Sequence, residues 1–112
     1  MAKGKFIFAG ENIPYKNLST TVAIKYNDIV NLMTRIGIAA ADIPPSGEGT
    51  LFTTGVWELP AINTAAFMVG MAVYWDDLTG KITNTTSGST VPAGWVIAPK
   101  TASGTSVKVK IG

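Results

Sequence analysis

The chain has 112 residues, a formal net charge of +2, 46% hydrophobic residues and 14% charged residues. This length suits one domain with one hydrophobic core and excludes a two-domain enzyme. Cysteine and histidine are both absent, which excludes disulfides, thiol nucleophiles, Ser-His-Asp catalysis and ordinary zinc sites, so we expect no catalytic residue, no metal and no cofactor.

The N-terminal residues combine two lysines with a short apolar run at residues 6–8. This run is shorter than the ~7–15-residue apolar core of a signal peptide. No charge-free stretch reaches the ~20 residues that span a bilayer. We therefore expect no membrane association and no export, with synthesis in the cytoplasm. Residues 1–9 are expected to be an N-terminal arm or a first strand, and residues 10–112 a single β domain.

The rest of the chain consists of short β-forming runs interrupted by Gly, Pro, Asn and Ser. We predict strands at residues 5–8, 20–24, 29–33, 36–39, 50–54, 55–59, 71–75, 81–84, 94–98 and 106–111. Residues 62–69 suggest at most a turn of helix. So many short strands in one small domain predict an all-β fold, either a small β-barrel or a sandwich, with little or no helix.

Two segments carry charges that invite a functional interpretation. Asp76 and Asp77 lie where a strand is followed by Gly80 and a returning strand, which predicts a hairpin turn and not a calcium loop with spaced oxygen ligands. Lys108 and Lys110 alternate with apolar residues in the last strand, which predicts one face in the core and one in water. No basic run accompanies these lysines, so we expect no nucleic-acid partner.

The glycine-bearing loops at residues 44–50 and 102–106 lack the G-x-x-x-x-G-K-[ST] pattern of a phosphate-binding loop. They are similar to each other instead. Laying residues 37–55 over residues 94–112 without gaps aligns glycines, an alanine and a serine at matching places. We therefore predict two related strand-turn-strand units packed in one barrel.

The low charged share, against a typical value of about 25%, predicts that a partner covers part of the surface. The tryptophans carry much of the available apolar area, and core packing is the first expectation for them. Aromatic anchors are also favoured at interfaces. The oligomer-interface candidates are Trp57, Trp75 and Trp95.

Several motifs together carry a family resemblance. They are the run Gly-Val-Trp-Glu-Leu-Pro at residues 55–60, Val-Tyr-Trp-Asp at 73–76 and Gly-Lys-Ile-Thr at 80–83, with spaced glycines and the closing alternating strand. Over nearly its whole length the chain resembles the small capsid cement (decoration) proteins of tailed bacteriophages. Members were formerly labelled predicted phage recombinases, a label that the missing phosphate loop argues against. Asn27 and Met71 stand where the family usually has a glycine and an acidic residue.

The resemblance implies a structural virion protein, not an enzyme, that binds the outer surface of a phage head and bridges major capsid protein subunits. It also implies a homo-oligomer, with a trimer favoured by similarity to decoration proteins at three-fold sites. The main alternative is a small homo-oligomeric binding module such as a phage fibre or tail component. A hydrolase built on carboxylates is a more distant alternative.

The N-terminal segment is the first choice for the capsid contact. In an extended chain its alternation places Phe6 and Phe8 on one side, where both rings can enter a groove. The loops around residues 44–45 and 76–77 are the alternative binding surfaces. The candidate capsid-contact residues are Ala2, Lys3, Lys5, Phe6 and Phe8.

Overall fold

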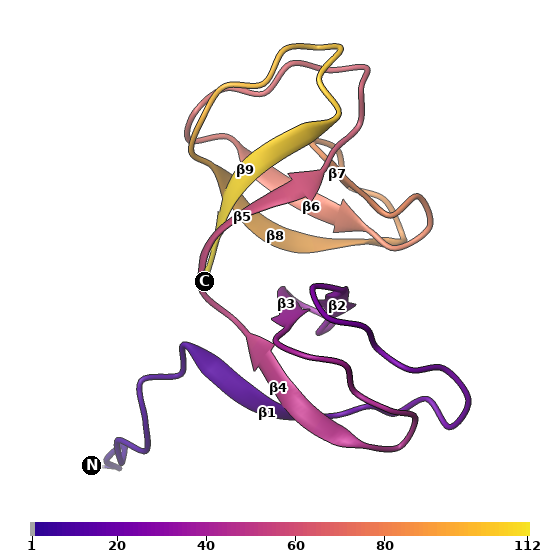
Figure 1. The fold of residues 1–112 in the computed structure, drawn as a ribbon. Coiled ribbons are helices and arrows are strands. Elements are labelled where there is room, and N and C mark those ends of the chain that lie inside the picture. Colours follow the sequence, from indigo (N-terminus) through magenta and orange to yellow (C-terminus); the bar gives the residue numbers. More distant parts are fainter. Residues whose placement is uncertain (1) are drawn as a thin grey trace.

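A computed structural model describes residues 2–112 as two antiparallel β-sheets, one above the other (Figure 1). The strands are β1 (Asn12–Lys16), β2 (Ile29–Asn31), β3 (Ile36–Ala39), β4 (Glu48–Phe52), β5 (Gly55–Pro60), β6 (Ala72–Asp76), β7 (Lys81–Thr83), β8 (Thr90–Val96) and β9 (Ser106–Ile111). The sheet orders are β1-β4-β3-β2 and β5-β9-β8-β6-β7. Residues 2–112 contain no helix, so the all-β prediction is confirmed. Neither sheet closes on itself, and a two-layered packing takes the place of a barrel.

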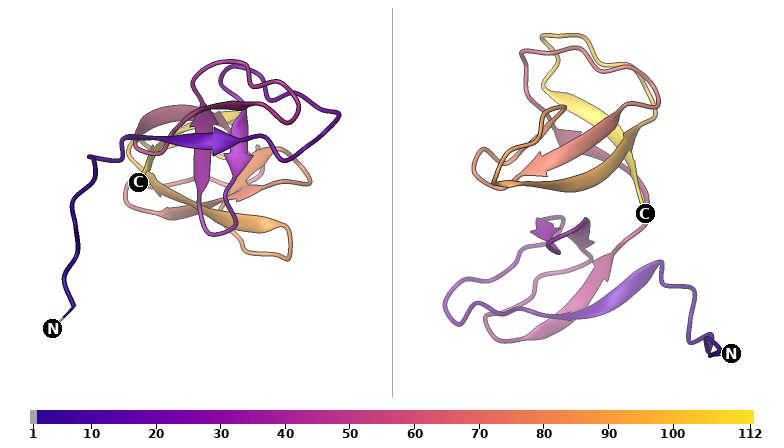
Figure 2. Two further views of the ribbon diagram at one scale, coloured as in Figure 1. Left: turned by 90° about the horizontal axis from the view of Figure 1, so that it is seen from below. Right: turned by 180° about the vertical axis from the view of Figure 1, so that it is seen from behind.

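Most of the predicted strands occur, because their alternating apolar residues are buried on the pleated sheet surface. The strand predicted at residues 5–8 is wrong: residues 2–10 form no strand, and no neighbouring segment supplies backbone partners. Figure 2 shows this segment running away from both sheets. The strand predicted at residues 20–24 is also wrong. The Ser19 hydroxyl accepts hydrogen bonds from the backbone amides of Thr21 at 3.3 Å and Val22 at 2.9 Å, and these local bonds replace the pairing of a strand.

The sequence analysis missed β1. Ile13 and Tyr15 alternate there with polar or proline positions, and a proline is unfavourable in the interior of a sheet. The structure tolerates Pro14 because β1 is an edge strand that pairs only with β4. The suggested helical turn at residues 62–69 is a loop, which holds Phe67 against Lys100 through an isolated bridge.

The four-stranded sheet and four strands of the five-stranded sheet have the same topology. Strands β1, β2, β3 and β4 correspond to β5, β6, β8 and β9, and β7 is an additional strand. In each half, two long loops meet at an isolated antiparallel bridge, Ile24 with Ile43 and Phe67 with Lys100, with paired backbone hydrogen bonds of 2.7–3.0 Å. We call residues 11–54 the N-terminal unit and residues 55–112 the C-terminal unit.

The sequence match between residues 37–55 and 94–112 corresponds to equivalent hairpins, β3–β4 and β8–β9. In both turns a glycine amide donates to the carbonyl three residues earlier, Gly47 at 2.9 Å and Gly104 at 3.1 Å. The two hairpins lie in different sheets and not in one barrel, because each joins the strands of its own unit. The structure therefore extends the similarity from a hairpin to a whole sheet.

The same equivalence explains Asn27. Its amide donates to the Ala39 carbonyl at 2.9 Å, as the amide of Gly70 donates to Val96 at 2.8 Å. Asn27 has φ +68° and Gly70 has φ +87°. Asparagine is among the few residues that tolerate this left-handed region, so the N-terminal unit keeps the turn without glycine.

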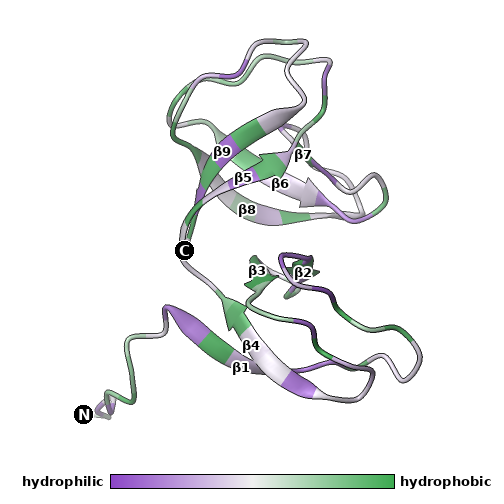
Figure 3. Cartoon of the chain, viewed as in Figure 1, coloured by the Kyte–Doolittle hydropathy of each residue, from purple (hydrophilic) through white to green (hydrophobic). Residues whose placement is uncertain are grey.

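The core is divided between the units. Ala39, Ile43 and Leu51 are buried under the loops of the N-terminal unit. The opposite face of the same sheet contributes Ile36 and Ile38, at 2% and 1% exposure, to the core of the C-terminal unit. In Figure 3, β3 has apolar colouring and lies between the rest of its own unit and the upper sheet. Strand β3 is therefore covered on both faces, whereas β1 and β4 keep exposed positions.

Candidate functional site

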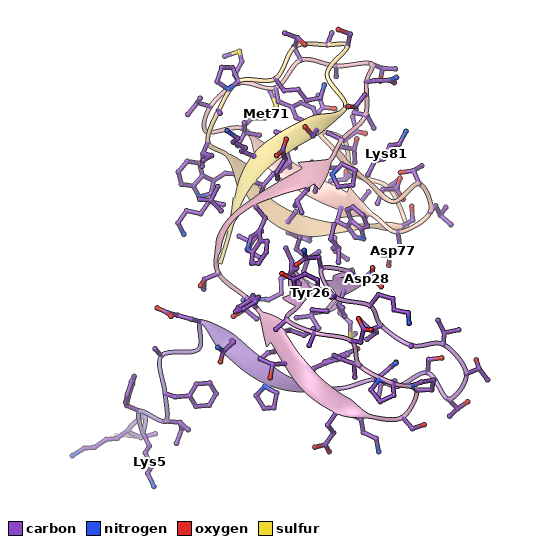
Figure 4. All side chains as sticks on the ribbon, viewed as in Figure 1. Lys5, Tyr26, Asp28, Met71, Asp77 and Lys81 are labelled. Atoms are coloured by element: carbon purple, nitrogen blue, oxygen red, sulfur yellow. The ribbon has the colours of Figure 1, made fainter. Side chains whose placement is uncertain are left out.

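The N-terminal arm, which we define as residues 2–9, is the most exposed apolar segment in the described part of the chain. Phe6, Ile7 and Phe8 are 83%, 69% and 54% exposed. The arm is anchored at its base, where the Thr53 hydroxyl donates to the Gly10 carbonyl at 2.6 Å. Figure 4 shows Lys5 at the far end of this segment, away from both sheets. All candidate capsid-contact residues therefore lie together on one projecting segment.

The three tryptophans differ in surroundings. Trp75 is 8% exposed and packs in the core, where its indole nitrogen donates to Asp77 at 2.8 Å. Trp57 is half-buried, with its indole nitrogen donating to the Thr54 carbonyl at 3.0 Å and its ring 5.5 Å from that of Phe52. Trp95 is 44% exposed on the outer face of β8. Of the three interface candidates, Trp95 alone presents a large apolar surface to solvent.

The loops offer further apolar side chains that the sequence analysis did not single out. They carry no periodic pattern, so no sequence signal separates them from core residues. Their exposure ranges from 59% to 85%. These residues are Leu18, Val22, Tyr26 and Met33 in the N-terminal unit, and Met68, Val69 and Leu78 in the C-terminal unit.

The predicted hairpin at residues 74–83 is confirmed, with Asp76 opposite Lys81 and Gly80 at φ +68°. The Ser89 hydroxyl donates to Asp76 at 2.8 Å, the Leu78 amide donates to it at 2.9 Å, and these bonds hold the pKa of Asp76 below its usual value. Asp77 also accepts a hydrogen bond from Asn31 of the other unit. The two carboxylates thus order a turn and an inter-unit contact.

A cleft of about 410 Å³ lies between the units. Its lining contains threonine hydroxyls and Arg35 but no acidic side chain. Within residues 2–112 no cluster of three acidic residues could hold a metal ion, and no helix could cross a membrane. The cleft is lined by Gly10, Thr34, Arg35, Ile36, Thr53, Thr54, Pro92, Ala93, Gly94 and Gly112.

A comparison with protein families shows which family the chain belongs to. A family model described as phage cement protein matches residues 8–111. The chain belongs to the phage cement protein family. Comparisons with curated proteins and with solved structures found no match. Cement proteins are structural components of the phage capsid, which agrees with the absence of histidine and cysteine from this chain.

The family match covers both units of the cement protein and all three tryptophans. Of the candidate capsid-contact residues it includes only Phe8, and Ala2, Lys3, Lys5 and Phe6 precede it. The family thus accounts for the two-sheet body. The arm has to be argued from the exposure of this chain's own residues.

Each unit of the cement protein holds its two long loops together with one buried nitrogen. In the N-terminal unit the Asn17 amide donates to the Val22 carbonyl at 2.9 Å and to those of Ile43 and Pro44 at 3.4 and 3.3 Å. In the C-terminal unit Lys100 supplies this nitrogen from a different position in the unit. The loop pairs are therefore fixed surfaces, positioned by the body of the protein.

We predict that Lys100→Met lowers the free energy of unfolding by about 2–3 kcal/mol. Lys100 is 6% exposed, and its ammonium donates to the carbonyls of Ala65 at 2.7 Å and Thr101 at 2.8 Å. Methionine keeps the apolar stem but leaves these carbonyls without their donor. Urea denaturation measures the loss. Lys81→Met is the matched control, since Lys81 is exposed on β7, and its curve should coincide with that of the wild type.

Proposed function

We propose that this cement protein binds the outer surface of an assembled phage capsid and stabilises the head by bridging neighbouring major capsid protein subunits. The exposed arm carries this proposal. Two phenylalanines more than half exposed on a projecting segment are costly in water and are suited to a groove on another protein. Outer-surface attachment follows synthesis in the host cytoplasm and requires no catalytic group.

Bridging is supported by the separation of the arm from the body. The arm leaves the N-terminal unit at Gly10, whereas the exposed loops project elsewhere on the molecule (Figure 2). One copy can therefore contact one capsid subunit through the arm and a second through its body. Self-association, with a trimer favoured by the resemblance to other decoration proteins, would multiply these contacts, and multivalency converts weak contacts into stable attachment.

The proposal is tested with Phe6→Ala/Phe8→Ala in the full chain. Burying two phenylalanine side chains contributes about 3–6 kcal/mol, so we expect attachment to heads to weaken roughly 100-fold or more. The thermal unfolding midpoint should stay nearly unchanged, since both rings are more than half exposed and belong to neither core cluster. Attachment is measured by co-sedimentation with heads that lack cement protein.

Two controls define the outcome. Ile7→Ala removes an apolar side chain of similar exposure, which would lie opposite the two rings when the arm binds in extended form, and should bind heads with wild-type affinity. Deletion of residues 2–5 removes both lysines and keeps the two aromatic rings, so it separates the contribution of the lysines to binding from that of the rings.

Undiminished binding by the double variant would move the capsid contact to the loops around residues 44–45 or 76–77. Co-sedimentation of the wild type with tails and not with heads would favour the fibre or tail component.

A further inference from the structure

The duplicated units present the same cross-strand row on their rear faces, by which we mean the faces away from each unit's own loops. In the N-terminal unit the strand register aligns Ile29 with Ile38, Ile38 with Phe52 and Phe52 with Asn12. In the C-terminal unit it aligns Ala72 with Trp95, Trp95 with Lys110 and Lys110 with Val56. The four shared strands have the same order, so the two rows are equivalent by cross-strand pairing. The β8–β9 hairpin has one more residue between the paired positions than the β3–β4 hairpin, so Phe52 corresponds to Lys110 by pairing although the ungapped sequence match places it with Val109.

The row in the N-terminal unit is an interface within the chain. Ile38 is 1% exposed and belongs to the core cluster of the C-terminal unit, and Ile29 packs against that cluster. The Phe52 ring lies 5.5 Å from the ring of Trp57, which belongs to the other unit. A unit of the same fold therefore covers this row at Ile29, Ile38 and Phe52, whereas Asn12 at the edge of the sheet is exposed.

The equivalent row in the C-terminal unit has no cover in the described chain. Trp95 and Val56 are 44% and 52% exposed, and Ala72 is exposed beside them. The neighbouring Val96 is fully buried, so the strand's alternation directs Trp95 outward. Trp95 therefore lies between Ala72 and Lys110, with Val56 on the far side of Lys110, and an exposed tryptophan of this kind is favoured at interface centres.

We infer that the row formed by Ala72, Trp95, Lys110 and Val56 binds a second copy of this chain. The contact would continue the interface between the units from one chain into the next, because the equivalent row already binds a unit of this fold. The inference rests on the self-association proposed above and identifies the surface through which two copies associate.

The N-terminal unit of the second copy is the expected partner surface. Within one chain, the covering unit contributes Trp57, which pairs with Val109 across β5 and β9. Ile13 is the equivalent residue of the N-terminal unit, because it pairs with Leu51 across β1 and β4. Ile13 is only half-buried, so the N-terminal unit has an apolar surface at the equivalent place. Pairing of unlike units is a head-to-tail contact that can close into a ring.

The test compares the wild type with Trp95→Lys by sedimentation velocity over a concentration series. Replacing a residue at the centre of an interface reduces the binding free energy by about 2 kcal/mol or more, so we expect self-association to weaken at least roughly 30-fold. Leu78→Lys is the matched control: Leu78 is 84% exposed on the hairpin turn, away from the row, and should leave the oligomer intact. A wild type that stays monomeric at every concentration overturns the inference, as does an unchanged oligomer of folded Trp95→Lys.

A second readout does not depend on Trp95→Lys folding. The natural chain has no cysteine, so Val56→Cys and Leu78→Cys each carry one thiol for maleimide labelling. We expect the thiol at position 56 to be protected as protein concentration rises and the thiol at position 78 to react at a constant rate. Equal reactivity of the two thiols at all concentrations, with protection at position 56 only on heads, would assign the row to the capsid and overturn the inference. Head binding by monomeric Trp95→Lys would leave the proposed function standing.

Discussion

Gly94→Ala is expected to lower the free energy of unfolding by about 4 kcal/mol or more, which is enough to unfold many domains of this size. Gly94 lies in β8 with φ +149°, and a Cβ there would stand 2.0 Å from the carbonyl oxygen of Lys110. That oxygen belongs to the backbone of β9, so relief requires the two strands to separate. The change would disrupt the pairing of Trp95 with Lys110 and of Val96 with Val109. Urea denaturation followed by tryptophan fluorescence measures the loss.

Two other glycines separate the steric clash from backbone strain. Gly70 has φ +87° with nothing within 4 Å of a built Cβ, so Gly70→Ala should cost about 1 kcal/mol from conformation alone. Gly88 has neither strain nor a close neighbour, and Gly88→Ala should be nearly neutral. Gly70→Asn should be milder than Gly70→Ala, because Asn27 already occupies the equivalent turn. Equal stability of Gly94→Ala and Gly88→Ala would contradict the close approach of β8 to β9.

The sequence predicted those elements whose stability comes from local alternation. Val107, Val109 and Ile111 alternate with lysines and polar residues, and the strand was placed correctly. The hairpin around Gly80 was predicted because its turn residues suit only a few backbone conformations. Strand β1 was missed because its stability depends on a distant partner, β4, and on an edge position that tolerates Pro14.

Only the structure shows which of the candidate interface tryptophans is exposed. Trp75 and Trp95 both lie in β-strands with alternating neighbours, and nothing local says which face of each strand is inward. The answer depends on how β6, β8 and β9 are registered, including the irregularity between Val73 and Tyr74. The glycine match between hairpins was visible in the sequence, whereas the equivalence of the outer strands was not, because β1 and β5 share few residues.

Phe67→Ala is expected to lower the free energy of unfolding by about 4 kcal/mol, the second largest effect among these predictions. Phe67 is 1% exposed in a loop, yet its backbone bridges Lys100 and its ring lies 4.9 Å below the Lys100 ammonium. Alanine would leave a cavity between the C-terminal sheet and its covering loop. It would also remove the ring that the ammonium contacts. Urea denaturation of the folded variant measures the effect.

Ile24→Ala is the matched control from the duplicated unit. Ile24 makes the equivalent bridge, to Ile43, but it is only half-buried, so we expect its loss to cost about 1–2 kcal/mol. Equal losses for the two variants would mean that the covering loops contribute alike despite their different burial. That result would contradict the assignment of Phe67 to the main core.

A double-variant cycle then tests how the C-terminal loops are held. Phe67 and Lys100 touch each other, so Phe67→Ala and Lys100→Met should not add. We expect the double variant to be more stable than the sum of the single losses predicts, by about 1 kcal/mol, because the cation–π contact is removed by either change. Ile24→Ala combined with Lys100→Met should be additive, since these residues lie in different units. Additivity in the first pair would mean that Lys100 stabilises the loops through its carbonyl partners alone.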